Sequence, residues 1–112
     1  MAQIHYPGPE TIQRVVLPNG LTILAYENFA SESIVIEGLV RAGAQGESAD
    51  RAGLASFTAA LLDRGTTRRS FAEIYEALES VGADISFSSG RHTSDFGAAG
   101  LVEDADLMLA LL

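Results

Sequence analysis

Hydrophobic and polar positions follow two different periods along this chain of 112 residues, and each period predicts one kind of element. Two short runs, 13–17 and 21–27, lie on either side of Asn19-Gly20 and predict strands, and a third run at 33–41 alternates or is continuously apolar. Two more strands are predicted at 84–88 and 94–101, which a turn-like segment separates. Apolar residues at helical spacing predict three helices, which begin near residues 54, 71 and 103. The chain is therefore predicted to be α+β, with a largely antiparallel sheet and helices packed on one face.

Local polar signals define two boundaries more closely. Asn19-Gly20 lies between the first two strands and predicts a hairpin, because both residues tolerate a positive φ. Ser70 and Glu73 form the sequence pattern of a capping box at the start of the second helix. Gly82 is placed to end that helix in a left-handed conformation.

The first predicted helix combines an apolar stripe with a face of small residues. Residues at the i, i+3, i+7 and i+8 positions predict one buried face, formed by Leu54, Phe57, Leu61 and Leu62. The same geometry gathers other residues on an adjoining face: Ser56, Ala59, Ala60 and Asp63. We expect Ser48 or Asp50 to cap this helix at its N-terminus.

This helix resembles the metal-binding helix of the M16 zinc metallopeptidases, the inverzincin family that includes pitrilysin and mitochondrial processing peptidase. Residues 53–66 follow the family frame G-L-A-H-F-x-E-H with a later G-T, but Ser56, Ala59 and Ala60 replace its His, Glu and His. In the family, the two histidines hold zinc and the glutamate acts as general base. Alanine has no lone pair to offer, and one serine hydroxyl is a poor zinc ligand. The resemblance therefore implies no catalytic residue, no metal and no other cofactor in this chain.

Other segments carry the same resemblance in the same order. Residues 17–21, L-P-N-G-L, resemble the family's opening turn, and residues 40–43 with Glu47 resemble the strand end and acidic loop before the metal helix. Residues 78–83 and the strand-like run after them resemble the next helix and strand. The resemblance implies an M16 peptidase-like half-domain, in which 1–12 is a polar lead and 13–112 is the N-terminal portion of one domain. Because an apolar helix occupies the last residues, we expect the chain to be truncated within it.

The net charge and the apolar content of the chain limit the classes of partner that we expect it to bind. The formal net charge of −8 argues against nucleic acid or an anionic membrane as a partner, since both would repel the chain at long range. No apolar run approaches the roughly 20 residues that span a bilayer, and the N-terminus lacks the pattern of a signal peptide. If Met1 is the natural start, the predicted location is cytoplasmic.

The remaining polar residues do not form a recognisable catalytic or metal-binding pattern. His5 and His92 each lack a second histidine at ligand spacing, and nothing in the sequence orients His92 as a base for Ser56. Three aspartates at 63, 84 and 95 lie on different elements at no known metal-binding spacing. Arg68-Arg69 could attract an acidic partner or a peptide C-terminus, but a solvated loop between helices is the preferred interpretation.

Two functional expectations follow from the resemblance. M16 peptidases hold peptide substrates partly as an added strand at the sheet edge beside the metal helix. The resemblance places that edge at Ile85, Ser86, Phe87 and Ser88, where an ordinary paired strand is the alternative. It also implies a non-catalytic subunit or half that pairs with a zinc-bearing homologue carrying H-x-x-E-H, together forming a peptide-degrading or peptide-processing metalloendopeptidase. The alternatives are a structural or assembly protein of a larger complex, or a parent chain that carries a zinc motif elsewhere.

Overall fold

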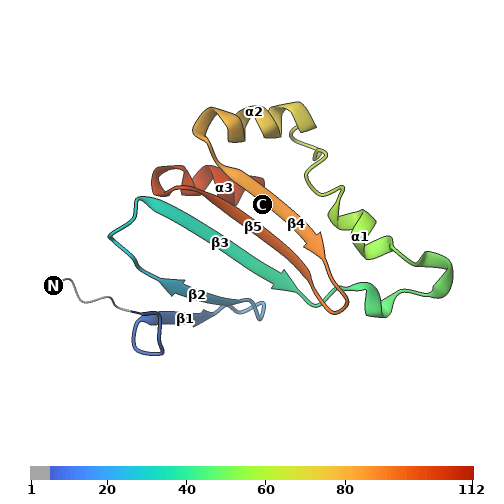
Figure 1. The fold of residues 1–112 in the computed structure, drawn as a ribbon, viewed down its shortest axis with the longest axis horizontal. Coiled ribbons are helices and arrows are strands. Elements are labelled where there is room, and N and C mark those ends of the chain that lie inside the picture. Colours follow the sequence, from blue (N-terminus) through green and yellow to red (C-terminus); the bar gives the residue numbers. More distant parts are fainter. Residues whose placement is uncertain (1–5) are drawn as a thin grey trace. The chain divides into compact units, whose positions relative to one another are not determined.

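The computed structural model describes residues 6–112, and the chain divides into two units, Met1–Ser31 and Glu32–Leu112. The elements of each unit are labelled in Figure 1. Most of the predicted polar lead is included, and strand β1 begins directly after Thr11. His5 lies outside the described residues, so the structure says nothing of it.

The first unit contains a β-hairpin formed by β1 (Ile12–Val16) and β2 (Thr22–Tyr26), which pair antiparallel. The turn closes where the Gly20 N–H donates to the Leu17 carbonyl oxygen at 2.9 Å, and Gly20 has a φ of 87°. Asn19 keeps a negative φ and contributes through its side chain, whose Oδ1 accepts from the Leu21 N–H at 3.1 Å. The predicted hairpin is confirmed, with the left-handed residue being Gly20 alone.

The second unit is built on a three-stranded antiparallel sheet in the order β3-β5-β4. Its strands are β3 (Ser33–Val40), β4 (Asp84–Ser89) and β5 (Ser94–Leu101). The central strand β5 pairs Ala98 with Ile36 on one side and with Ile85 on the other. Because side chains alternate along a strand, this row faces one side of the sheet and the neighbouring rows face the other.

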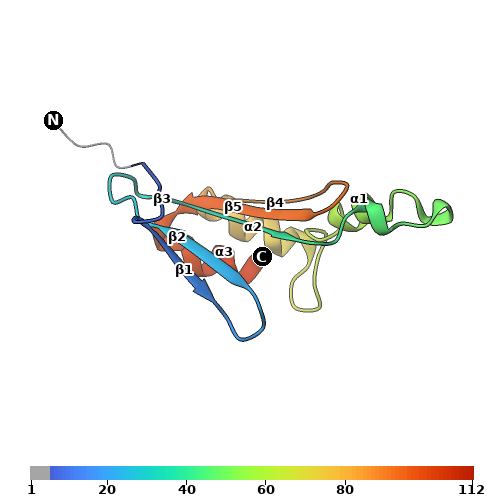
Figure 2. The same ribbon diagram turned by 90° about the horizontal axis from the view of Figure 1, so that it is seen from below.

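Helices α2 (Phe71–Val81) and α3 (Ala105–Leu111) cover one face of this sheet, as Figure 2 shows. Between them and the strands lies the core, formed by Ile74, Leu78, Ile85, Ala98 and the fully buried Met108. Helix α3 approaches strand β5 closely because Gly100 has no side chain, and a Cβ there would lie 3.0 Å from Met108 Sδ. Antiparallel sheets and helices on one face confirm the predicted α+β fold.

Helix α2 begins and ends as its sequence predicts. The Ser70 side chain accepts from the Glu73 N–H at 3.3 Å, while the Glu73 carboxylate accepts from the Ser70 N–H at 2.7 Å. The Glu73 carboxylate also accepts from the Ser70 hydroxyl at 2.8 Å. The bonds from the Ser70 N–H and from the Ser70 hydroxyl both lower the pKa of Glu73, and the backbone bond is the larger cause. Gly82 ends the helix with a φ of 66°.

The remaining elements are short. Two 3₁₀ turns, η1 (Ala44–Gly46) and η2 (Ala49–Arg51), precede helix α1 (Leu54–Ala59), and η3 (Val102–Asp104) leads into α3. The segment between β3 and α1 thus contains two single turns of helix. Across residues 6–112, no helix has the length and apolar content needed to cross a membrane.

Candidate functional site

Helix α1 is held at its N-terminus by Glu47. Its carboxylate accepts hydrogen bonds from the Gly53 N–H at 2.7 Å and from the Ala55 N–H at 2.6 Å. The prediction that Ser48 or Asp50 caps this helix is wrong, because Gly53 is the N-cap residue and no side chain caps from that position.

The local backbone explains why Ser48 and Asp50 do not cap α1. Ser48 and Asp50 belong to the separate turn η2, where a hydrogen bond from the Ser48 side chain lowers the pKa of Asp50. Gly53 then adopts a φ of 94°, which turns the chain sharply before the helix begins. The first N–H groups of α1 therefore meet a side chain from six to eight residues upstream.

The three motif positions lie together on α1 and its last turn. The Ala60 N–H donates to the Ser56 carbonyl oxygen at 3.1 Å, so these two positions are one helical turn apart, as a pair of metal-binding histidines would be. Ser56 and Ala60 are exposed, whereas Ala59, at the glutamate position, is only 5% exposed. Within residues 6–112 no group of three or more His, Cys, Asp or Glu side chains could hold a metal ion. The backbone spacing that the H-x-x-E-H frame requires is therefore present between Ser56 and Ala60.

The apolar stripe of α1 is not buried within this chain, so that prediction is wrong. The exposed fractions are 50% for Leu54, 65% for Phe57, 48% for Leu61 and 51% for Leu62. The helix buries its small Ala59 instead. After Ala60 the backbone tightens, since the Leu61 N–H donates to the Thr58 carbonyl oxygen at 3.0 Å, an i to i−3 bond. Leu61 and Leu62 thus follow the helix, and its buried residue is one that the apolar periodicity did not select.

Asp63, which the sequence groups with the motif face, is used in a structural contact. Its Oδ2 accepts a hydrogen bond from the Tyr75 hydroxyl at 2.8 Å, joining the segment after α1 to helix α2. This hydrogen bond is the main cause that raises the pKa of Tyr75. Beside it, the Arg64 guanidinium lies 4.9 Å from the centre of the Phe71 ring. No local pattern in the sequence indicates this cluster, because its members come together only when the chain folds.

The predicted peptide-binding residues lie on β4, an edge strand of the three-stranded sheet. Ile85 is buried and Phe87 is half-buried on the face covered by helices, whereas Ser86 and Ser88 are exposed on the other face. Helix α1 contacts β4, and Figure 1 shows it beyond that strand of the sheet. The metal-type helix and an edge strand are therefore neighbours, and peptide binding at this edge stays a prediction.

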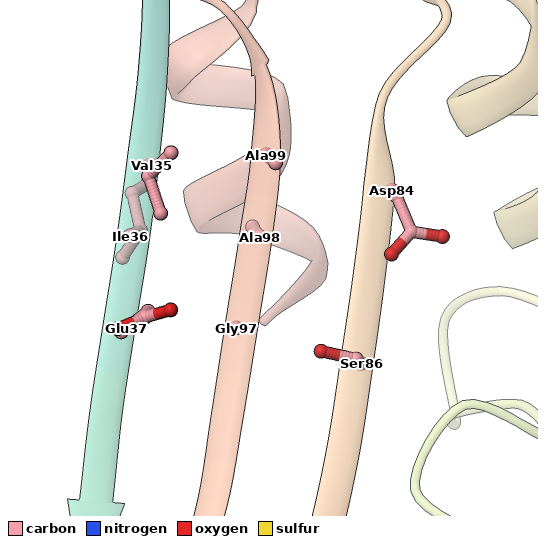
Figure 3. Close-up of a pocket in the computed structure, with 8 residues that line it drawn as sticks. All are labelled: Val35, Ile36, Glu37, Asp84, Ser86, Gly97, Ala98 and Ala99. Carbon is pink, nitrogen blue, oxygen red and sulfur yellow. The ribbon is translucent and has the colours of Figure 1, made fainter.

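A small hollow of about 100 Å³ crosses the uncovered face of the sheet. In Figure 3 the oxygens of Glu37 and Ser86 point toward one another across Gly97. Gly97 leaves this space open, because a Cβ there would lie 3.2 Å from Ser86 Oγ. The rest of the lining consists of one further carboxylate, that of Asp84, and of the apolar residues Val35, Ile36, Ala98 and Ala99. No pair of groups suited to acid–base or nucleophilic catalysis meets there.

The other residues weighed for chemistry are placed apart. Ser56 lies on α1 and His92 in the turn between β4 and β5, and no hydrogen bond joins them in the part of the chain that the structure describes. Asp84 and Asp95 lie on two paired strands, and Asp95 accepts from the Thr93 hydroxyl at 3.5 Å. Neither arrangement forms a nucleophile or cation site.

Several curated proteins are similar in sequence to this chain, although no model of a protein family matches it. An uncharacterized zinc protease of Rickettsia felis is 28% identical over 96 residues, or 86% of this chain and 23% of the relative. A second, from Mycobacterium leprae, is 32% identical over 99 residues, or 88% of this chain and 22% of the relative. The probable beta subunit of mitochondrial-processing peptidase from Arabidopsis thaliana is 27% identical over 105 residues, 94% of this chain and 20% of that protein. The chain thus spans less than a quarter of the length of these relatives.

A solved structure shares the fold. The crystal structure of a peptidase M16 inactive domain from Pseudomonas fluorescens matches with a TM-score of 0.79 and 20% identity, over 89% of this chain and 24% of that one. The fold is that of an M16 peptidase-like domain. The resemblance to the M16 peptidase family drawn from the sequence is confirmed. That Ser56, Ala59 and Ala60 occupy the family's motif positions stays a prediction.

Proposed function

We propose that this chain belongs to a non-catalytic M16 subunit or half, which pairs with a zinc-bearing homologue to form a peptide-degrading or peptide-processing metalloendopeptidase. The observation that carries this proposal is the helical turn from Ser56 to Ala60, which keeps its backbone geometry while offering no metal ligand. Support comes from relatives named zinc proteases and from the similar structure described as an inactive domain. In this proposal the partner supplies both the H-x-x-E-H motif and the zinc.

An unburied apolar surface supports a pairing role. Four large apolar side chains are exposed on α1 and in the turn that follows it, namely Leu54, Phe57, Leu61 and Leu62. Contiguous exposed apolar patches commonly mark surfaces that bind other protein. The same surface is the observation that favours the alternative role, a structural or assembly protein with no protease in its complex.

The edge of β4 is the proposed place of peptide contact in this half. An added strand is held mainly by backbone hydrogen bonds, so this contact needs none of the lost motif side chains. Ser86 and Ser88 are exposed beside it, and the metal-type helix is a neighbour. A peptide with alternate backbone amides N-methylated tests the mode, because only one of the two alternating sets of N–H groups would face β4. Equal binding by both N-methylated sets and by the unmodified peptide would argue against strand addition.

Native mass spectrometry of the full-length parent, purified from the soluble and membrane fractions of its source cells, tests the pairing. We expect a soluble, cytoplasmic hetero-complex with a fixed ratio of a second M16 chain, and zinc at the stoichiometry of that chain. Hydrolysis of a peptide by the 112-residue chain alone, or tight stoichiometric zinc in it, would refute the proposal. A zinc-free homodimer or a membrane assembly would favour the structural role, and an H-x-x-E-H motif in the parent itself would place the active half in the same protein.

A further inference from the structure

A second hollow, of about 440 Å³, lies where the end of β3 meets the turn between β4 and β5. Arg41 contributes from the residue after β3, and Arg91 and His92 contribute from the turn. The segment 42–46 supplies the rest of the lining, mainly small residues. None of these residues is part of the motif helix or of the β4 edge, so this is a separate site.

Backbone contacts hold the two walls of this hollow together. The Ala44 N–H donates to the Gly90 carbonyl oxygen at 3.0 Å, and the Gln45 N–H donates to the Arg91 carbonyl oxygen at 2.8 Å. The segments pack so closely at Gly43 that a Cβ there would lie 2.6 Å from the Arg91 backbone. The positions from which both arginines extend are therefore fixed by the fold, independently of the conformations of their long side chains.

The charge in this hollow is not compensated. Across residues 6–112, neither the Arg41 nor the Arg91 side chain takes part in an ion pair or hydrogen bond, whereas Arg64 pairs with Asp63 at 3.2 Å. The whole chain has only 7 basic residues against 15 acidic ones, and two of the 7 lie here together. Arginine stays protonated and presents paired N–H donors that fit the two oxygens of a carboxylate.

We propose that this hollow binds a carboxylate of a polypeptide, either an acidic side chain or a C-terminal carboxylate. The proposal rests on the proposed function only in taking the ligand to be a peptide. β4 ends at Ser89 and the turn with Arg91 follows at once, so a peptide strand extending along β4 past Ser89 would reach the hollow. The site would thus select peptides or partner segments with a negative charge at that point, although the chain as a whole is acidic.

Three short peptides of one sequence distinguish the two carboxylate sources. The first has two glutamates and blocked termini, the second has glutamines in their place, and the third has the glutamines with a free C-terminus. Each is titrated into the isotope-labelled 112-residue chain, and the backbone amides of Gly43, Gly46 and Gly90 are followed by NMR. Shifts at these glycines with the first peptide assign side-chain recognition, and shifts with the third assign C-terminal recognition. If the second peptide shifts them equally, or none of the three does, the proposal is overturned.

Two variants and a control locate the effect. Arg41→Gln and Arg91→Gln should each weaken binding of the preferred peptide by up to about fivefold, the scale for exposed ion pairs, and the double variant more. Arg68→Gln makes the same change in net charge on the loop between α1 and α2, and it should leave binding unchanged. An equal loss with Arg68→Gln would show general electrostatics and refute the site. Binding of a neutral peptide to β4 that persists after both substitutions would support the proposed function independently of the result at the hollow.

Discussion

Replacing Glu47 with alanine should loosen the motif helix selectively. The substitution removes a carboxylate that accepts from the Gly53 and Ala55 N–H groups at 2.7 and 2.6 Å. Helix α1 has only six residues, so few of its own hydrogen bonds hold it once these are lost. Loss of a helix cap costs about 1–2 kcal/mol, which corresponds to a factor of about 5–30 in the opening equilibrium of this segment.

Hydrogen exchange measures that opening residue by residue. The Phe57 amide donates to the Gly53 carbonyl oxygen at 2.9 Å and so reports the first turn of the helix. Its exchange should accelerate by about 5–30-fold in Glu47→Ala under conditions where the exchange rate follows the opening equilibrium. The Ile74 amide of α2, which donates to the Ser70 carbonyl oxygen at 3.1 Å, serves as an internal reference and should change little.

Glu79→Ala is the matched control variant, because it removes the same charge from an exposed position on α2. It should leave the exchange of the α1 amides unchanged. The reasoning would be refuted if Phe57 exchanged equally fast in Glu47→Ala and in the wild type. Equal acceleration by Glu79→Ala would instead attribute the effect to net charge, and the two hydrogen bonds would then carry no stabilisation of their own.

Three further substitutions probe the core and the contact between α1 and α2. Met108→Ala should lower the free energy of unfolding in urea by about 2–5 kcal/mol, because Met108 is fully buried, whereas Leu109→Ala at a 60% exposed neighbour should cost far less. Gly38→Ala should cost about 1–3 kcal/mol or prevent folding, since its Cβ would lie 2.6 Å from Phe96 Cε1; a wild-type midpoint in urea would contradict the close approach. The raised pKa of Tyr75 means that the folded state keeps this proton longer than the unfolded state. Its contribution to stability is therefore present below about pH 10 and is lost as the pH rises through the raised pKa, so Tyr75→Phe should flatten the alkaline decline measured by chemical denaturation.

The sequence was most informative where the determining contacts are local. Ser70, Glu73 and Gly82 specify the ends of α2 within 13 residues of chain, and the structure has all of the predicted cap contacts. The Asn19-Gly20 turn belongs to the same group, although only its glycine needed a positive φ. In each case the side chain and the backbone groups it satisfies are near neighbours, so a short pattern contains the whole interaction.

Contacts between residues that are distant in the sequence could not be predicted from such short patterns. The cap of α1 comes from Glu47 because a left-handed Gly53 redirects the chain, and no pattern of propensities shows that reach. Arg41 and Arg91 are fifty positions apart, and they meet because β3 pairs with β5 up to Val40 and Ser94. Periodicity likewise assigned the apolar residues of α1 to one face without showing which face the fold would bury.

The burial of Ala59 affects whether this helix could hold a general base at that position. In an active M16 helix this position holds the general base, a group that must be ionisable and reach a metal-bound water. Here the side chain is 5% exposed, and a glutamate in its place would either lose most of its hydration without a partner or push the helix away from its contacts. Restoring histidines at the exposed Ser56 and Ala60 would therefore rebuild part of a metal frame, whereas restoring the base requires α1 to dock differently. The small, buried residue at position 59 therefore agrees with the non-catalytic role proposed above.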